Sequence, residues 1–308
     1  MPLIKNKLIL TFTFLVQVTH GYTQNNTTSN PPVFHRDRFT GVLITETITG
    51  LAITLGLNYL WYKKFPHSRF HFFNDNSEWL GMDKAGHATT AYNIAAVQND
   101  IMRWTGMRPG TAALTGSLTA LCFMTMIELM DGHSAKWGFS KGDMVANISG
   151  CLLFQLQQWA WHEQRIELKY SFHKTIFPRY NSDELGKNIW QQMLKDYNGQ
   201  TYWLSFNIAS FLPASYNVPK WLNVTAGYGA EGMTGARFNP TFNNGNKLPS
   251  FERYHQYYLG LDTDLFRINN LTEFTRSLLK INRTIKLPAC VYEWDSLKKQ
   301  KKFIPFYF

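Results

Sequence analysis

Hydrophobic residues in the first half of the chain gather into four long segments separated by short polar connections. The segment 40–62 is apolar except for Glu46 and ends in an aromatic and basic run. Its length suits a membrane span, while its threonines and glycines suit a buried core helix equally well. Three further helices are predicted at 84–104, 109–130 and 140–161. Four helices with short connections predict a compact helical bundle.

The pattern changes after residue 200, where short segments combine aromatic and β-branched residues with partial alternation. This composition predicts strands at 203–212, 221–228, 253–266 and 285–294. Further helices are expected at 181–197 and 271–281. The expected fold class is α+β: an N-terminal, membrane-associated bundle of about four helices, followed by a smaller, irregular antiparallel β-rich C-terminal region. The strands are too few and too irregular to predict a complete barrel.

The first 22 residues have the pattern of a signal peptide. Lys5 and Lys7 flank the start of the apolar run 8–18, which is too short to span a bilayer, and a polar stretch follows. An exported protein is therefore expected, and a lipid-modified N-terminal Cys is not, because no Cys lies near this boundary. The predicted divisions are a signal peptide 1–22, an exposed leader 23–39, a helical core 40–165, a connecting helical segment 166–200 and a β-rich region 201–308.

Composition narrows the expected partners. Aromatic residues make up 16% of the chain and charged residues only 17%, which favours contact with an interface. The net charge of +10 is dispersed, and its densest run, at 298–302, is either a solvated basic end or an attraction for anionic lipid or polysaccharide. Three Cys at unpaired spacings indicate neither a disulfide framework nor a zinc site. Membrane or envelope lipid or glycan is expected as partner, and nucleic acid is not, since no nucleic-acid module is recognisable.

Polar residues lie inside or beside the most apolar segments of the first half of the chain. They are Asp83, Lys84, His87, Glu128, Asp131, Ser140, Asp143 and Asn147. Burying such groups costs free energy unless they meet one another, a metal or a ligand. Their spacing therefore predicts one shared polar centre between the helices.

Some of these residues have a local explanation. Asp83 suits the N-cap of a helix, and Asp131, which precedes a glycine, suits a turn. Ser140 and Asp143 match the capping box. Asp143 also shares a helix face with Asn147, so it remains a candidate for the polar centre.

Three residues lack a local explanation. His87 lies one turn after Asp83 and is either a satisfied core histidine or a member of the site. Glu128 lies near the end of a helix, where the helix dipole disfavours a carboxylate, so a partner such as His87 or Lys84 is expected. Asn147 is a poor residue for a helix interior.

These motifs resemble those of a known family. They are Asp83-Lys84-x-x-His87, Glu128-x-x-Asp131 and Ser140-x-x-Asp143-x-x-x-Asn147-x-x-Gly150. They are similar to the YfiM-like periplasmic lipoproteins of bacteria, over about residues 79–155, and more distantly to VanZ-like membrane proteins. The tail at 221–233 resembles longer YfiM-like members from Bacteroidetes-type bacteria. The resemblance implies an exported cell-envelope protein with a helical core that carries its site at the motif positions. We also expect the protein to face the periplasm and to be associated with a membrane, with the outer membrane as one candidate.

Three functions remain open. In the first and favoured one, the polar centre is a network with a structural or interaction role that fixes the register of the helices. In the second, the protein is a hydrolase or transferase that acts on envelope lipid or glycan. In the third, the aromatic β-rich tail is a platform for lipid or glycan.

The enzyme hypothesis assigns roles to particular residues. His87 would be the general acid or base, positioned by Asp83 or Glu128, and Lys84 would stabilise a developing anion. A metal-assisted version would use His87, Glu128 and Asp143 as ligands. No cofactor is assigned, and the sequence contains no H-E-x-x-H motif, nucleophile elbow or P-loop.

Overall fold

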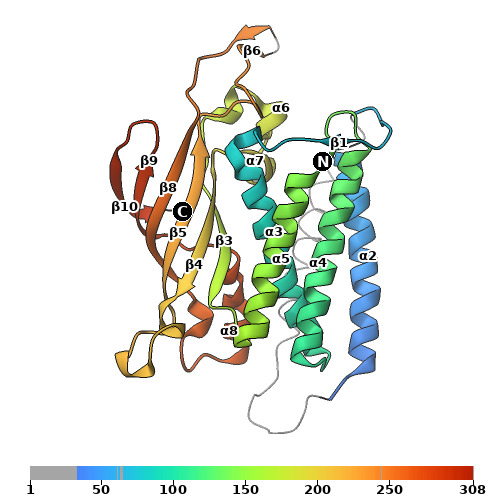
Figure 1. Ribbon diagram of the computed structural model, residues 1–308, viewed down its shortest axis with the longest axis vertical. Helices are drawn as coiled ribbons and strands as arrows, with labels where there is room; N and C mark the ends of the chain where they lie inside the picture. Colours follow the sequence, from blue (N-terminus) through green and yellow to red (C-terminus); the bar gives the residue numbers. More distant parts are fainter. Residues whose placement is uncertain (1–32, 61, 63–64, 244, 308) are drawn as a thin grey trace. The chain divides into compact units, whose positions relative to one another are not determined.

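The computed structural model describes residues 33–60, 62, 65–243 and 245–307. The predicted signal peptide and most of the predicted leader lie outside these residues. The chain divides into two compact units. The helical unit comprises Met1–Phe73, Ala91–Glu163 and Leu271–Leu278, and the sheet unit comprises Asn74–Thr90, Gln164–Asn270 and Leu279–Phe308. Figure 1 follows the chain through the helices and strands of both units.

Four long helices correspond to the four apolar segments of the sequence. They are α2 Arg36–Leu60, α3 Met82–Trp104, α4 Pro109–Gly132 and α5 Lys141–Trp161. The boundary between the units falls inside α3, after Thr90. Within the helical unit α4 packs closely on the second half of α3, because a Cβ at Gly116 would lie only 2.6 Å from the carbonyl oxygen of Ala95. Helices α2 and α4 are long and apolar enough to cross a membrane, judged by length and composition.

Three short helices bring the described α-helices to seven, whereas four bundle helices and two further helices were expected. They are α6 Ser182–Leu185, α7 Ile189–Lys195 and α8 Glu273–Leu279. The range 181–197 forms two helices instead of the single predicted one. Asn181 and Asn188 each cap a separate helix start, and Gly186 between them has a φ of 100°, which no helix accepts.

Six strands of the sheet unit form one antiparallel sheet in the order β10-β9-β8-β5-β4-β3. They are β3 Ile166–Phe172, β4 Gln200–Asn207, β5 Leu222–Glu231, β8 Tyr254–Thr263, β9 Ala289–Asp295 and β10 Lys301–Tyr307. The four predicted strands overlap β4, β5, β8 and β9. Short strands form two further pairs, β1 Phe72–Phe73 with β2 Phe139–Ser140, and β6 Phe242–Asn243 with β7 Asn246–Lys247.

The prediction that the segment 166–200 is helical is wrong at its start, which forms β3. Residues 166–172 alternate Ile, Leu, Tyr and Phe with Glu, Lys and Ser, which is a period of two. The period therefore indicated a strand, although three of its seven residues are polar or charged.

Trp203 occupies the core of the sheet unit. It is 1% exposed and packs with Tyr258 and Val291 on the covered face of the sheet. Its partner in register on β5 is Gly227, where a Cβ would lie 2.5 Å from the indole ring. The glycine therefore makes room for the largest side chain of this core.

Candidate functional site

The chain enters α3 through a strained turn. The 3-10 turn Glu78–Gly81 has a φ of 49° at Trp79 and 52° at Leu80. Left-handed conformations at non-glycine residues cost about 1–3 kcal/mol each, so surrounding contacts must hold them. The Trp79 N–H donates to the Ala236 carbonyl over 2.8 Å, and the Tyr228 hydroxyl donates to the Leu80 carbonyl. These bonds set where α3 begins.

An ion-pair cluster lies at the first turn of α3. The Lys84 Nζ is 2.6 Å from Asp75 Oδ1 and 3.2 Å from Asp83 Oδ2. The other Asp83 oxygen accepts a hydrogen bond of 2.6 Å from the Tyr197 hydroxyl. The three charged side chains are between 12% and 20% exposed, so water screens their attraction only in part. The cluster ties the loop before α3, the helix itself and the segment after α7 together.

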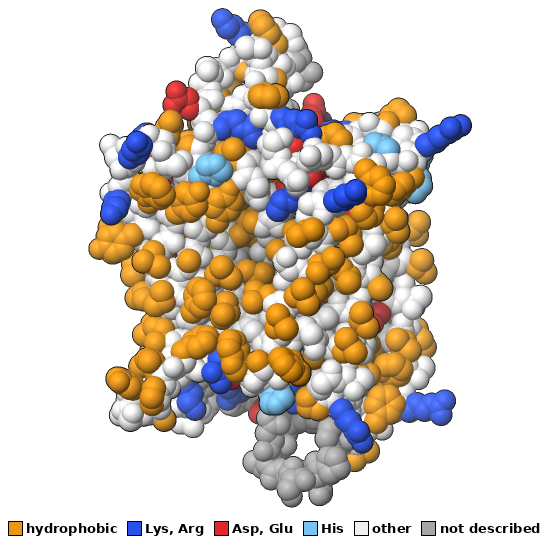
Figure 2. Space-filling view, in the orientation of Figure 1, with side chains coloured by type: hydrophobic (Ala, Val, Ile, Leu, Met, Phe, Trp, Pro, Cys, Tyr) orange, Lys and Arg blue, Asp and Glu red, His pale blue; other side chains and the backbone are white. Residues whose placement is uncertain are grey.

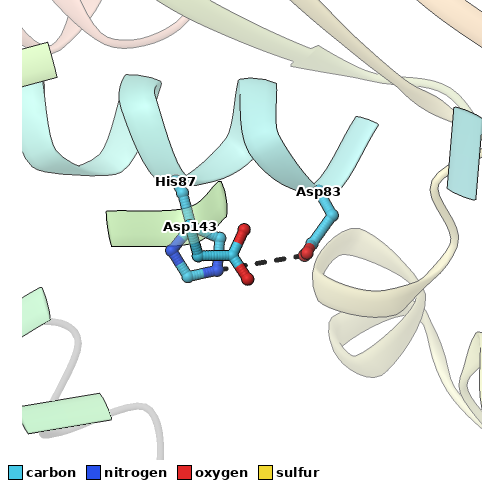
Figure 3. Close-up of side chains that lie close together, drawn as sticks. All are labelled: Asp83, His87 and Asp143. Carbon is cyan, nitrogen blue, oxygen red and sulfur yellow. Dashed lines mark ion pairs between the residues drawn. The ribbon is translucent and has the colours of Figure 1, made fainter. Parts of the chain in front are cut away.

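His87 lies one turn after Asp83 on the same face of α3, as Figure 3 shows. Its Nε2 is 3.9 Å from Asp83 Oδ1, which is too long for a hydrogen bond and within the range of an ion pair when the imidazole is protonated. The prediction that Asp83 caps the helix is wrong. Asp83 is the second residue of α3, where a carboxylate still complements the helix dipole, and its oxygens bind the side chains of Tyr197 and Lys84.

A second polar cluster joins α4 to the start of α5 inside the helical unit. The Asp143 N–H donates to Ser140 Oγ over 3.0 Å, which confirms the predicted cap. The Ser140 N–H donates over 3.1 Å to Glu128, which is 1% exposed. Glu128 thus takes the N–H that a capping box offers to its acidic residue. Asn147 is fully buried one turn further along α5.

Glu128 and Asp131, near the end of α4, have hydrogen-bond partners that the sequence did not predict. Glu128 is held near the end of α4 by the Ser140 N–H, and a bond from it to His87 or Lys84 stays a prediction. Asp131 lies in the last turn of α4, which continues to Gly132, and its carbonyl accepts the Ser134 N–H over 3.0 Å in the turn that ends the helix. Its carboxylate accepts a hydrogen bond of 2.8 Å from the Tyr62 hydroxyl.

A cavity of about 350 Å³ lies beside this Tyr62 side chain in the helical unit. Its lining includes Met126, Met130 and His133 and is largely apolar. None of the candidate site residues lines this cavity. The cavity therefore gives no support to the enzyme hypothesis.

Sequence reasoning missed Asp75 and Tyr197. Asp75 stands in the polar run Asn74-Asp75-Asn76, which is an ordinary loop signal. Tyr197 is 114 residues from Asp83, its hydrogen-bond partner, and no local pattern links two such positions. Long-range partners of this kind are decided by the fold.

The ligand types for a metal ion are present on α3. Asp83 and His87 offer a carboxylate and an imidazole on adjacent turns, and divalent transition metals accept both. Asp143, also predicted as a ligand, belongs to the helical unit, whereas Asp83 and His87 belong to the sheet unit. Glu128, the other predicted ligand, belongs to the helical unit as well. One shared centre for all the candidate residues stays a prediction.

The region that carries the motifs matches the model of one protein family. Residues 71–158, which contain α3, α4 and most of α5, match the model of a family described as "Predicted periplasmic lipoprotein (DUF2279)". The matched range includes every candidate residue from Asp83 to Asn147. The chain matches no curated protein and no solved structure. The match supports the similarity to periplasmic lipoproteins and an exported protein of the cell envelope.

Proposed function

We propose that this chain is an exported envelope protein that is associated with a membrane through its helical unit, and that its polar residues have a structural or interaction role. The observation that carries the proposal is that α4 and α5 bury small and polar residues while they expose apolar ones. The buried residues include Ala112, Gly116, Ala120 and Glu128 of α4, and Asp143, Ala146, Asn147 and Gly150 of α5. The exposed residues include Leu114, Leu118 and Leu129 of α4, and Val145, Ile148, Leu152, Leu156 and Trp159 of α5.

The exposed apolar residues of each helix form a stripe. On α5 they recur at intervals of three and four residues from Val145 to Trp159, which places them on one side of the helix. On α2 the same spacing joins Ile44, Ile48, Leu51 and Leu55. Figure 2 shows hydrophobic side chains gathered on the face of the molecule in view. A helix of a soluble bundle turns its apolar stripe inwards, whereas a helix in lipid turns it outwards and packs through small residues.

The structural role of the polar residues is supported by the way they satisfy one another. In the sheet unit Lys84 lies between two carboxylates, and Asp83 also accepts the Tyr197 hydroxyl. In the helical unit Glu128 binds the backbone at the start of α5. Networks of this kind hold helix ends in one arrangement when their groups are paired.

Membrane association is tested by washing membranes from cells that express the full chain with alkaline carbonate. The wild type is expected to stay in the pellet. Leu152→Lys, which places a charge on the α5 stripe, should be released or degraded, and the matched apolar change Leu152→Phe should be retained. Release of the wild type into the supernatant would reject membrane integration.

The structural role is tested by unfolding Asp83→Asn and Tyr197→Phe in detergent. Tyr197→Phe removes one hydrogen bond to a carboxylate and is expected to lower the unfolding free energy by about 1–2 kcal/mol. Asp83→Asn should lower it at least as much, because Lys84 loses one of its two partners. Tyr216→Phe, at a residue that is 67% exposed, is the control and should change little. Wild-type stability in both test variants would argue against a structural role.

A second candidate function is a metal-assisted hydrolase or transferase for an envelope lipid or glycan, with His87 as acid, base or ligand. The Asp83–His87 pair on α3 favours it. Metal content is measured on purified protein after equilibration with Zn²⁺ or Mn²⁺. Asp83→Asn and His87→Ala should each lower the bound metal. Undiminished binding by His87→Ala would exclude this centre.

A further inference from the structure

Outside the cluster around Trp203, the six-stranded sheet buries polar side chains and exposes apolar ones, which is the opposite of a soluble antiparallel sheet. On β4 the polar Ser205 and Asn207 are buried and Leu204 is exposed. On β8 Asp262 is fully buried and Leu259 is 59% exposed. A soluble sheet turns apolar side chains to the core and polar ones to water. Strands in a membrane alternate in the reverse sense, with apolar side chains outward.

The strand register joins the outward residues into continuous apolar rows. One row crosses all six strands through Leu168, Leu204, Ala226, Leu259, Tyr292 and Phe303. A second row runs through Ile166, Phe206, Val224 and Leu261. Adjacent strands lie about 4.8 Å apart, so the side chains of a row are neighbours. The exposed apolar residues therefore form one surface and are not scattered.

A third row, beside the first, is aromatic and ends in a lysine. It runs through Tyr170, Tyr202, Tyr228, Tyr257, Trp294 and Lys301. Tyr202 and Tyr228 pack against Met82 of α3, so Tyr257, Trp294 and Lys301 form the exposed end of the row. The neighbouring β9–β10 turn exposes Lys298 and Lys299. Aromatic rings followed by basic side chains mark the level where hydrocarbon meets anionic headgroups.

The apolar surface has a height suited to a bilayer. From Tyr257 in the aromatic row to Thr263 at the end of β8 there are six residue steps, about 20 Å at the usual rise of a strand. The outward face of the described strands carries no charged side chain between these two levels. Apolar bands of membrane β proteins are about 25 Å tall.

Polar groups on the covered face of the sheet pair with one another. Ser205 Oγ donates to Asp262 over 2.6 Å, and the Trp203 Nε1–H donates to Ser171 Oγ over 2.9 Å. Lys169 Nζ lies 2.8 Å from Asp262. In water this arrangement costs free energy on both faces, since leucines are exposed and charges are desolvated. If the exposed face lies against hydrocarbon, its leucines are no longer in water and the cost of exposing them disappears.

We infer that the outward face of this sheet lies against the acyl chains of a lipid bilayer, with the β9–β10 lysines at the level of anionic headgroups. The occupant is lipid because the apolar rows end in an aromatic and basic border, which a second copy of the chain or a glycan would not require. The inference rests on the proposed membrane association and extends it from the helical unit to the sheet.

The test uses the full chain in liposomes of zwitterionic and anionic phospholipids that carry doxyl quenchers on their acyl chains. Single cysteines are introduced at Leu259, at Leu51 of α2 and at Lys247 of the β6–β7 hairpin, after the native cysteines are replaced by serine, and are labelled with a fluorophore. A label at 259 should lose most of its emission to the acyl-chain quencher and little to aqueous iodide. A label at 247, the control, should show the reverse.

The label at 51 separates failure of the inference from failure of the proposed function. Acyl-chain quenching at 51 but not at 259 would reject lipid contact of the sheet and leave membrane association intact. Absence of lipid quenching at both positions would reject both. Protection of 259 from lipid and iodide alike, with cross-linking between copies through cysteine at 292, would show a second copy on this face and overturn the inference.

A second measurement avoids the replacement of native cysteines. In liposomes with brominated acyl chains, the difference in tryptophan emission between the wild type and Trp294→Phe reports the indole of the aromatic row. Loss of that difference signal to bromine is expected. A difference signal that bromine leaves unchanged and iodide quenches would contradict lipid contact.

Discussion

Lys169 offers the sharpest test of the idea that the covered face of the sheet is a polar interior. Its side chain is fully buried, and its Nζ lies 2.8 Å from Asp262 and 2.9 Å from Asp264. It also donates to the Thr263 carbonyl over 3.0 Å. Lys169→Met keeps most of the apolar stem and removes the charge. The perturbation therefore isolates the ammonium.

The cost follows from what remains after the ammonium is removed. Asp264 keeps a partner, since Arg267 Nε lies 3.1 Å from its other oxygen. Asp262 keeps the Ser205 hydroxyl but loses the ammonium that faces it. Removing one partner from a buried ion pair typically costs about 3–5 kcal/mol, because the other charge stays desolvated. We expect Lys169→Met to lose a free energy of unfolding in this range.

Denaturant titration in detergent, followed by tryptophan fluorescence, measures the loss. The exposed Lys302→Met is the matched control and should change stability by no more than about 0.5 kcal/mol. The double variant Lys169→Met/Asp262→Asn should regain much of the loss, because the amide is neutral and still accepts from Ser205. A loss below about 1 kcal/mol in Lys169→Met would refute the assignment of this face as a desolvated interior.

Two further predictions concern single positions. Burial lowers the pKa of His173 from its ordinary value of 6.5, with Glu231 and Asp196 opposing the shift, so the folded state favours the neutral ring. Below about pH 6.5 the unfolded state therefore binds more protons than the folded state, and the free energy of unfolding should fall as the pH drops. In a pH series of denaturant titrations, His173→Gln should show a weaker pH dependence than the wild type. Ser140→Ala removes the cap of α5 and should lower the free energy of unfolding by about 1 kcal/mol. The control Ser149→Ala, at an exposed helix position, should not lower it. Equal melting temperatures for the two variants would contradict the capping role.

The long helices follow closely from the order of residues along the chain. Pro109 suits the first turn of α4, and Ser140 followed by Asp143 marks the start of α5, because capping depends on residues within one turn of each other. The alternation in residues 166–172 carried equally local information about β3. Local signals of this kind act over a few residues and do not depend on the rest of the fold.

Some contacts of the candidate residues follow from local spacing, and others depend on the tertiary structure. The shared helix face of Asp83 and His87 follows from a spacing of four residues. The other partners of Asp83 and Glu128 do not follow from spacing. Tyr197 reaches Asp83 from a distant segment, and the Ser140 N–H satisfies Glu128 because α4 and α5 pack together. Burial of a carboxylate could be expected from the sequence, whereas the donor that meets it could not.

The sequence by itself determined the apolar helical segments, the cap of α5, most of the strands and the placement of charged groups among apolar ones. The tertiary structure alone decided which face of each helix and strand is covered and which is exposed. A strand that alternates Leu and Ser has one apolar and one polar face in either case, and its own sequence does not state which face is covered. In this protein the covered face carries polar side chains beside the Trp203 cluster, and the row through Leu204, Leu259 and Tyr292 stays exposed. The physical reason is that Lys169, Asp262 and Ser205 come from three different strands and can satisfy one another only on a common covered face.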